Sequence, residues 1–484
     1  MGSIVEEADS SQPHVLLFPF MSKGHTIPLL HFARLLLRRH VTLTLITTPA
    51  NRPFISHSLR HHPAAAVIDI PFPTDVPGIP AGVESTDQLP SMSLFSKFAA
   101  ATARMQPHLE RVLATLPLPR VSLMVSDGFL WWTLQSASKF DIPRLVYYGM
   151  SCHANALTRE AFVSGVFSGP QHRDELVPLT RFPWIRVCKN DFPPEFSDSD
   201  PTSLAAQFHT DVVTSAVKSF GTLVNSFYEL EPVFVDYLSQ NSTPHAYYCV
   251  GPLCLAEEEI DTRNLQEAFP KKASWIEWLD KKHEESRTCG VVYVAFGSQA
   301  EISHEQLKEI AYGLEESQVP FLWVIRRKEW ESQLPEGFEE RVGDKGMIVR
   351  DWVDQREILN HEGVKGFVSH CGWNSVLEAV CAGVPILAMP MMAEQYLNAR
   401  MVEEEMKVGM RVETCDGSVR GFVRREGVRK KVRELMMVEG EKGEEVRRKV
   451  GEVAEMAKKA VEDGGSSWRT LENLLVETCK KKKT

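Results

Sequence analysis

The beginning of the chain alternates between short apolar runs and an amphipathic helix pattern. His14–Phe20 is an apolar run, and residues 29–37 carry apolar side chains at helical spacing. Val41–Ile46 is a second run, rich in β-branched residues. A strand, a helix and a strand within about 35 residues form a βαβ unit, from which parallel sheets are built. This start places the chain in the α/β class.

The alternation continues, stops at an acidic stretch from Ala256 to Ala273, and then restarts. We therefore predict two Rossmann-like, doubly wound parallel-sheet domains, at 1–252 and 274–463, joined by a linker at 253–273. Further strands are expected at Ala66–Ile70, Val121–Val125, Arg144–Tyr148 and Thr222–Asn225 in the first domain, and at Gly290–Ala295, Phe321–Ile325, Met347–Val349, Gly366–Ser369 and Val384–Met389 in the second.

Composition excludes several classes of protein. The net charge of −10 over 484 residues argues against a nucleic-acid binder, which needs a dominant basic face. The nine cysteines form no CxxC pair, so a disulfide framework or a structural zinc site is not expected. The polar N-terminus lacks the apolar stretch of a signal peptide, and no run approaches the ~20 apolar residues of a membrane span. We expect a soluble cytoplasmic protein.

Ligands of open parallel sheets bind beyond the carboxyl ends of the strands. In the first domain, His25 follows such an end at the start of a helix, and Asp127 ends the strand that begins at Val121. A histidine whose tautomer is fixed by a carboxylate can accept a proton near neutral pH. The alternative is structural: a loop histidine and an aspartate that caps a helix.

In the second domain, the segment from His370 to Ser375 lies at a strand-to-helix turn, and Phe296–Ser298 forms another turn of this kind. Small residues there leave backbone N–H groups available at the positive end of a helix, which suits an anion. His370, Asn374 and Ser375 add side-chain donors, enough for a diphosphate. The alternative is that Asn374 and Ser375 serve only as local helix caps.

Other phosphate and catalytic signatures are absent. The chain has no GxGxxG after its first strand, no GxxxxGK[ST] and no GxSxG, which disfavours a dinucleotide oxidoreductase, a P-loop NTPase and an α/β-hydrolase. His57 and His61 are four residues apart, but Pro53 and Pro63 bracket a short stretch without a thiol or carboxylate. We interpret that stretch as a solvated loop rather than a metal site.

The stretch from Trp352 to Gln395, WVDQREILNHEGVKGFVSHCGWNSVLEAVCAGVPILAMPMMAEQ, resembles the signature box of plant family 1 UDP-sugar-dependent glycosyltransferases. The segments FPFMSKGHTIPLL and VSDGFLWW occur in the order found in that family. The resemblance implies a GT-B fold with an interdomain cleft, an acceptor-binding N-terminal domain and a UDP-sugar-binding C-terminal domain. It also implies that a last helix, within 464–484, returns to the N-terminal domain.

The resemblance implies roles for residues of the box. Trp352 would stack on uracil, Gln355 would lie near the base and ribose, and Glu378 would accept hydrogen bonds from the ribose hydroxyls. The remaining donor-site residues would hold the diphosphate (Ser298, His370, Asn374 and Ser375) or contact the sugar (Trp373, Glu394 and Gln395). A terminal glutamine in this box usually accompanies UDP-glucose. Taken singly, Trp352 and Trp373 fit core packing as well.

The resemblance assigns His25 and Asp127 to the catalytic pair of an inverting displacement. Asp127 would orient His25, and His25 would remove the acceptor proton while the acceptor oxygen attacks the anomeric carbon. No metal or other cofactor is implied, because the donors of the box would stabilise the leaving UDP. The chain departs from the common pattern at Asp354, Glu394 and Ala295, where proline, aspartate and a serine or asparagine are frequent.

Loops of the N-terminal domain are expected to form the acceptor pocket. Its candidate residues are Leu94, Phe95, Phe129, Trp131, Trp132, Tyr148 and Met150, each of which is also suited to a core. Apolar and aromatic walls favour a flat phenolic acceptor such as a flavonoid. We expect a monomeric glucosyltransferase that forms an O-glucoside by default. The alternatives are an aryl C-glucosyltransferase and a non-catalytic UDP-sugar-binding protein, which the presence of His25 and Asp127 disfavours.

Overall fold

The computed structural model describes residues 13–116, 119–198, 200, 202–240, 246–256, 273–285, 290–326, 328–437 and 440–480. Contacts divide the chain into two compact units. The N-terminal unit comprises Met1–Gly149, Ser199–Glu257 and Ala460–Thr484, and the C-terminal unit comprises Met150–Asp198 and Glu258–Lys459. Most of the predicted linker, 253–273, lies outside the described residues, and the predicted domain boundaries stay a prediction.

The N-terminal unit is built on a seven-stranded sheet in the order β3-β2-β1-β4-β5-β8-β9, with every neighbouring pair parallel. Its strands are β1 (His14–Phe18), β2 (Thr42–Thr47), β3 (Ala65–Asp69), β4 (Leu123–Asp127), β5 (Arg144–Tyr148), β8 (Gly221–Val224) and β9 (Ala246–Cys249). The predicted strands are confirmed to within a few residues. The edge strand β9 was missed because its four residues carry no long apolar run.

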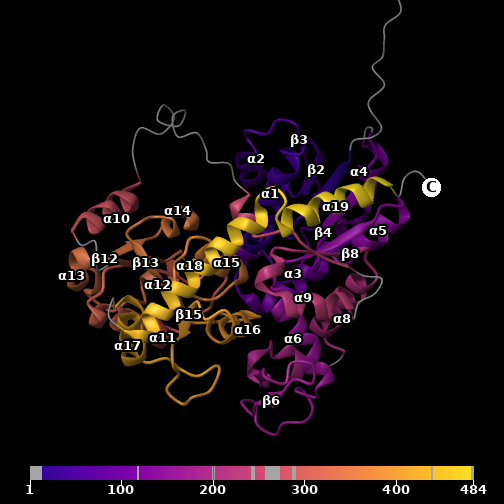
Figure 1. Ribbon diagram of the computed structural model, residues 1–484. Coiled ribbons are helices and arrows are strands. Elements are labelled where there is room, and N and C mark those ends of the chain that lie inside the picture. The colour runs from indigo at the N-terminus through magenta and orange to yellow at the C-terminus, as the bar shows by residue number, and fades with distance from the viewer. Residues whose placement is uncertain are drawn as a thin grey trace, which may run out of the picture. The chain divides into compact units, whose positions relative to one another are not determined.

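Apolar clusters cover both faces of this sheet. Alternate residues of β1 point to opposite faces, so Val15 and Leu17 join one cluster and Leu16 and Phe18 the other. The helices of the unit are α1 (Lys23–Leu37), α2 (Arg52–Ser58), α3 (Phe95–Ala101), α4 (Gln106–Thr115), α5 (Thr133–Lys139), α8 (Leu204–Val217), α9 (Pro232–Gln240) and α19 (Ser466–Lys480) (Figure 1). The first cluster contains the apolar face of α1 together with Leu471 and Leu474 of α19.

The C-terminal unit has a six-stranded parallel sheet in the order β12-β11-β10-β13-β14-β15. The strands are β10 (Val291–Ala295), β11 (Phe321–Val324), β12 (Gly346–Val349), β13 (Val364–Ser369), β14 (Ile386–Ala388) and β15 (Gly409–Arg411). A separate hairpin pairs β6 (Val177–Pro178) with β7 (Arg186–Val187). The three-residue strand β15 was not predicted.

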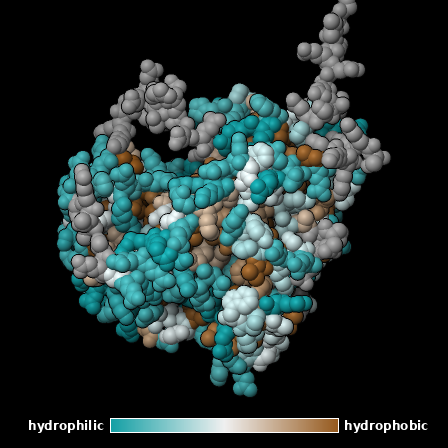
Figure 2. All heavy atoms as spheres, in the orientation of Figure 1, coloured by the Kyte–Doolittle hydropathy of each residue, from teal (hydrophilic) through white to brown (hydrophobic). Residues whose placement is uncertain are grey.

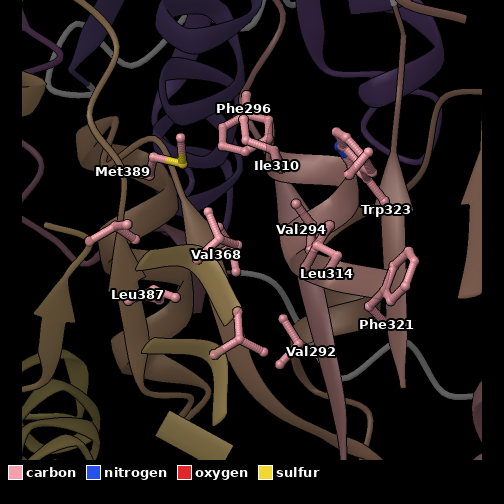
Figure 3. Close-up of a cluster of buried hydrophobic side chains, with 14 of the residues drawn as sticks. Val292, Val294, Phe296, Ile310, Leu314, Phe321, Trp323, Val368, Leu387 and Met389 are labelled. Atoms are coloured by element: carbon pink, nitrogen blue, oxygen red, sulfur yellow. The ribbon is translucent and has the colours of Figure 1, made fainter. Parts of the chain in front are cut away.

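Figure 3 shows the core on one face of this sheet, where Val292 and Val294 of β10 lie near Ile310 and Leu314 of the helix α11 (His304–Ser317). Burial of such apolar side chains drives the packing of helix on sheet. The helices of the unit are α6 (Cys152–Val163), α7 (Glu195–Asp198), α10 (Ser274–Glu285), α11 (His304–Ser317), α12 (Lys328–Glu331), α13 (Phe338–Val342), α14 (Gln355–Leu359), α15 (Trp373–Cys381), α16 (Gln395–Arg400), α17 (Arg425–Met436) and α18 (Glu441–Val461), whose last two residues group with the N-terminal unit.

Each sheet has one topological switch point, where the chain changes the direction in which it adds strands. The switch lies between β1 and β4 in the N-terminal unit and between β10 and β13 in the C-terminal unit. Ligands of open α/β sheets bind beyond the carboxyl ends of the strands at such points. The two sheets therefore define two places in which to look for functional side chains.

The described part of the chain contains no helix long and apolar enough to cross a membrane. In the same residues, no three His, Cys, Asp or Glu side chains gather into a group able to hold a metal ion. The face drawn in Figure 2 is mainly hydrophilic, with apolar residues scattered among charged ones.

Candidate active site

The side chains of His25 and Asp127 meet at the switch point of the N-terminal sheet. Phe18 at the end of β1 is paired with Ser126 of β4, which brings the third residue of α1 close to the end of β4. Nδ1 of His25 lies 2.7 Å from Oδ2 of Asp127. The other carboxylate oxygen of Asp127 accepts the backbone N–H of Phe129 at 2.9 Å. When Nδ1 carries the hydrogen shared with Asp127, Nε2 is the basic nitrogen of the neutral ring.

Burial differs between the two partners. The side chain of Asp127 is 1% exposed and that of His25 is 23% exposed. A buried carboxylate with two hydrogen bonds holds the ring in one orientation, while the ring keeps an accessible edge. The pair therefore has the arrangement that a general base requires.

Aromatic rings surround the imidazole. The centroid of Phe129 lies 5.1 Å and that of Phe20 5.7 Å from the His25 ring. Phe95 packs edge-on against both phenylalanines, and Phe208 of α8 lies 5.6 Å from Phe129. A flat aromatic molecule matches such a surface, because aromatic rings pack in edge-on and offset arrangements.

Six of the seven acceptor-site candidates lie in or beside this aromatic cluster. Leu94, Phe95, Phe129, Trp131 and Tyr148 are all half-buried residues packed against the same core, whereas Met150 is the first residue of the segment that groups with the C-terminal unit. Trp131 and Trp132 precede α5 rather than lying on it. The indole N–H of Trp132 donates to Oγ1 of Thr102, and its ring is buried.

Phe20 and Phe208 were not among the predicted acceptor residues. Phe208 contacts Phe95, Phe129 and Trp131, although it lies more than 75 positions after Trp131 in the chain. No local pattern in the sequence links these positions. Phe20 lies only five residues before His25, so the sequence alone could have predicted that its ring lies near the proposed base.

The two predicted anion-binding turns adjoin each other at the switch point of the C-terminal sheet. Ala295 at the end of β10 is paired with Ser369 at the end of β13. The His370 ring lies between two glycines, because a Cβ added to Gly297 or Gly372 would lie 2.8 or 2.6 Å from its Nε2. Gly297 also has a positive φ of 75°, a conformation that favours glycine.

Burial lowers the pKa of His370 to about 4, against a smaller opposite effect of the Ala295 backbone. The ring is therefore neutral at pH 7, with one nitrogen protonated. Its Nδ1 atom has no hydrogen-bond partner among the described residues. A neutral ring held rigidly between backbone segments can orient a ligand by hydrogen bonding, without contributing a charge.

Gln355 joins two residues of the predicted ribose and diphosphate site. Its Nε2 donates to Oγ of Ser375 at 2.9 Å and to Oε2 of Glu378 at 2.6 Å. Burial raises the pKa of Glu378 to about 7, and the hydrogen bond from Gln355 acts in the opposite direction. Asp354, one of the three departures from the family pattern, caps α14 by accepting the N–H of Arg356 at 3.0 Å.

The other donor-site candidates differ in exposure. Trp352 follows β12 and is 56% exposed, which leaves an indole face open for stacking. Trp373, in contrast, is 1% exposed, and its side chain belongs to the core. Ser298 and Asn374 are half-buried at the two turns.

The loop between β14 and α16 is held in place by Gln395. Its Oε1 accepts the backbone N–H groups of Met391 and Met392 at 2.9 and 3.0 Å. These bonds orient the amide, so that Gln395 can offer only its NH₂ group to another ligand. Glu394 occupies the N-cap position of α16 without capping it through its side chain.

Polar contacts anchor α16 to the segment Met150–Asp198. The amide of Asn398 bridges Oγ of Ser151 and the carbonyl of Cys371. Nε of Arg400 lies 2.8 Å from Oδ1 of Asp191, whose side chain is fully buried. Breaking this ion pair would leave the buried carboxylate of Asp191 without a cation, at a cost in the free energy of folding. The pair therefore fixes α16 against the segment Met150–Asp198.

Comparison with known proteins identifies the family. Residues 270–418 match the family model "UDP-glucoronosyl and UDP-glucosyl transferase". The chain is 53% identical to UDP-glycosyltransferase 90A1 of Arabidopsis thaliana, over 96% of each chain. The chain belongs to the UDP-glycosyltransferase family. Members of this family are enzymes that transfer a glycosyl group from a UDP-sugar to a small acceptor.

Two further proteins resemble this UDP-glycosyltransferase over nearly the whole chain. It is 34% identical to UDP-glucose flavonoid 3-O-glucosyltransferase 7 of Fragaria ananassa, covering 98% of this chain and 97% of the relative. The crystal structure of UGT73P12 of Glycyrrhiza uralensis, complexed with glycyrrhetinic acid 3-O-monoglucuronide, superposes with a TM-score of 0.84 at 27% identity, covering 98% and 97% of the two chains. The predicted GT-B fold is confirmed.

Proposed function

We propose that this glycosyltransferase transfers glucose from UDP-glucose to a hydroxyl group of a small phenolic acceptor, such as a flavonoid, with inversion at the anomeric carbon. The observation that carries the proposal is the hydrogen bond between His25 and Asp127 inside a cluster of phenylalanines. A phenol fits the aromatic surface and presents an acidic proton to the base.

In the proposed reaction, Nε2 of His25 takes the proton of the acceptor hydroxyl while the oxygen attacks the anomeric carbon. The bond between that carbon and the diphosphate breaks, and UDP leaves with the electron pair. Asp127 keeps the ring oriented and balances its new positive charge. The turns around His370 and the start of α15 are assigned to the diphosphate, where backbone N–H groups and side-chain donors favour negative charge.

Glucose as the transferred sugar is supported by the terminal Gln395 of the box and by the name of the Fragaria ananassa relative. Glu394 is one methylene longer than the aspartate frequent at this position, so its reach to the sugar hydroxyls differs. O-transfer is proposed because a deprotonated phenol oxygen is the direct nucleophile. Attack by a ring carbon would begin with the same deprotonation.

The test is an assay of the purified protein with UDP-glucose, UDP-galactose, UDP-xylose and UDP-glucuronate against a panel of flavonols, hydroxycoumarins and simple phenols. Products are then heated in acid, where an O-glucoside hydrolyses and an aryl C-glucoside survives. Acid-labile glucosides of a phenolic acceptor are expected. Acid-stable products, or turnover restricted to another sugar, would contradict the proposal.

We also propose that the enzyme works without a metal ion, as a monomer in the cytoplasm. The anion-binding turns supply donors for the diphosphate, and cysteines without a CxxC pair suit a reducing compartment. Full activity in excess EDTA and a sedimentation mass near 54.6 kDa are expected. Loss of activity on chelation, restored by a divalent ion, would contradict the first part.

A further inference from the structure

A fully buried arginine, Arg144, contacts the end of the strand that carries Asp127 of the proposed catalytic pair. Arg144 begins β5 and is 2% exposed. Its Nε donates to Oγ of Ser126 at 2.7 Å, its Nη1 to Oγ of Ser219 at 2.7 Å, and its Nη2 to the carbonyl oxygen of Asp127 at 3.3 Å. Two of these three acceptors belong to the last two residues of β4, the strand that carries the catalytic carboxylate.

Ser126 connects Arg144 to a second hydrogen bond near the site. Oγ of Ser126 lies 2.7 Å from Oγ1 of Thr133, at the start of α5, and Thr133 donates to the carbonyl of Leu130. Hydrogen bonds therefore hold the segment between Asp127 and α5 at both ends, from Arg144 at Asp127 and from Thr133 at the start of α5. This segment contains Phe129, whose N–H donates to the Asp127 carboxylate and whose ring packs on His25.

The charge of Arg144 needs compensation. Its guanidinium donates to three neutral oxygens, and no carboxylate lies within ion-pair distance of it among the described residues. Burial lowers the pKa of Arg144 to about 10, while Tyr148 and Asp127 act in the opposite direction, so the group stays positively charged at pH 7. A buried charge is costly unless an opposite charge is near.

Two tyrosines of β5, next to Arg144 and Asp127, carry no charge at neutral pH. Burial raises the pKa of Tyr147 well above its ordinary value and the pKa of Tyr148 likewise, so both phenols stay protonated. Tyr147 is the register partner of Asp127 on β5. Neither tyrosine therefore compensates the charge of Arg144.

Resting on the proposed function, we propose that Arg144 is a positioning residue for the His25–Asp127 pair: its guanidinium fixes the end of β4 and compensates the charge of Asp127. When the pair accepts a proton, it becomes more positive, and Arg144 opposes this protonation electrostatically. The positive charge therefore extends to lower pH the range in which the His25 ring is unprotonated and can accept a proton from the acceptor.

The test compares the pH dependence of kcat/KM for three variants, with UDP-glucose and the best acceptor of the panel. Arg144→Gln removes the charge and should move the acid limb of the profile to higher pH by about one unit, because a positive charge buried beside the end of β4 is lost. Arg144→Lys keeps a positive charge and should restore the limb. Ser219→Ala removes one hydrogen bond but no charge and should leave the limb in place.

A purely structural role for Arg144 predicts a different result. It would lower the melting temperature of Arg144→Gln and leave its acid limb where the wild-type limb lies, and that outcome would overturn the proposal. If Arg144→Gln does not fold, the double variant Asp127→Asn with Arg144→Gln decides, because removal of both charges should recover folding. A double variant that is no more stable than the single one would also overturn the proposal.

His25→Ala separates this inference from the proposed function. If that variant keeps full activity, the assignment of the base fails, whatever happens at Arg144. The thermal unfolding of the Asp127 and Arg144 variants still tests whether the two charges compensate each other, because coupled residues give non-additive effects.

Discussion

Nδ1 of His25 lies 2.7 Å from a carboxylate oxygen of Asp127, although the two residues are 102 positions apart in the chain. Adjacent parallel strands bring them together: His25 follows β1, Asp127 ends β4, and the two strands are hydrogen-bonded neighbours. The contact fixes which ring nitrogen of His25 binds the carboxylate, and substitution of His25 tests the proposed base directly.

Replacement of the base should abolish catalysis and spare the nucleotide site. His25→Ala is expected to lower kcat/KM by about 10²–10⁴-fold, the usual contribution of a general base. UDP affinity, measured by calorimetry, should stay within about twofold, because the donor residues lie in the other unit. His172→Ala, at an exposed histidine, is the matched control. Normal turnover by His25→Ala would refute the assignment.

The affinity for UDP should fall as the medium becomes acidic. The pKa of Glu378 is raised to about 7, and its ionised form accepts hydrogen bonds from the ribose hydroxyls more strongly than its protonated form. Between about pH 8 and about pH 6 the ionised fraction falls roughly tenfold, and affinity should follow. Because the phosphate of UDP also titrates, the comparison is with Glu378→Gln, whose affinity should be lower at pH 8 and vary less. Parallel pH profiles for the two proteins would contradict this role.

The glycines that hold the His370 ring should be essential for nucleotide binding. A Cβ at Gly372 would lie 2.6 Å from Nε2 of His370, so Gly372→Ala forces the ring to move. We expect UDP affinity to fall about tenfold or more, comparable to the loss of one or two hydrogen bonds. Gly451→Ala is the control, because its Cβ meets nothing within 4 Å and alanine favours a helix. Unchanged affinity in Gly372→Ala would exclude His370 from the site.

Phe208 should determine affinity for the acceptor. Phe208→Leu keeps an apolar side chain but loses the ring contacts to Phe95, Phe129 and Trp131, and we expect KM for a flavonol to rise about five- to tenfold. KM for UDP-glucose should not change. The control is Val217→Ala on the same helix, where the valine is 70% exposed. An equal rise in both KM values would indicate a general loss of structure instead.

The ion pair between Arg400 and Asp191 should stabilise the C-terminal unit. Arg400→Met leaves the buried carboxylate of Asp191 without its cation and should lower the free energy of unfolding by about 3 kcal/mol. Glu404→Ala removes the exposed partner of the same arginine and should cost less than about 0.5 kcal/mol. Urea unfolding measures both. Similar stabilities for the two variants would show that the buried pair contributes little.

The repeated alternation of strands and helices was enough to predict two parallel-sheet units, because apolar periodicity directly reflects burial on a sheet or helix face. The short edge strands β9 and β15 escaped detection, because neither contains a run of aliphatic residues such as the one in the edge strand β12. The positions at strand ends that the sequence singled out, His25, Asp127 and His370, do lie at the two switch points.

What the pattern of residues could not reveal are contacts between distant segments. Phe208 reaches the aromatic cluster from α8, Arg144 reaches the end of β4 from the neighbouring strand, and the glycines that hold His370 belong to two different turns. Local periodicity specifies which face of each element is buried, so it was readable from the chain. Which side chains then meet depends on strand order and on packing across the sheet, and these arise only when the whole chain has folded.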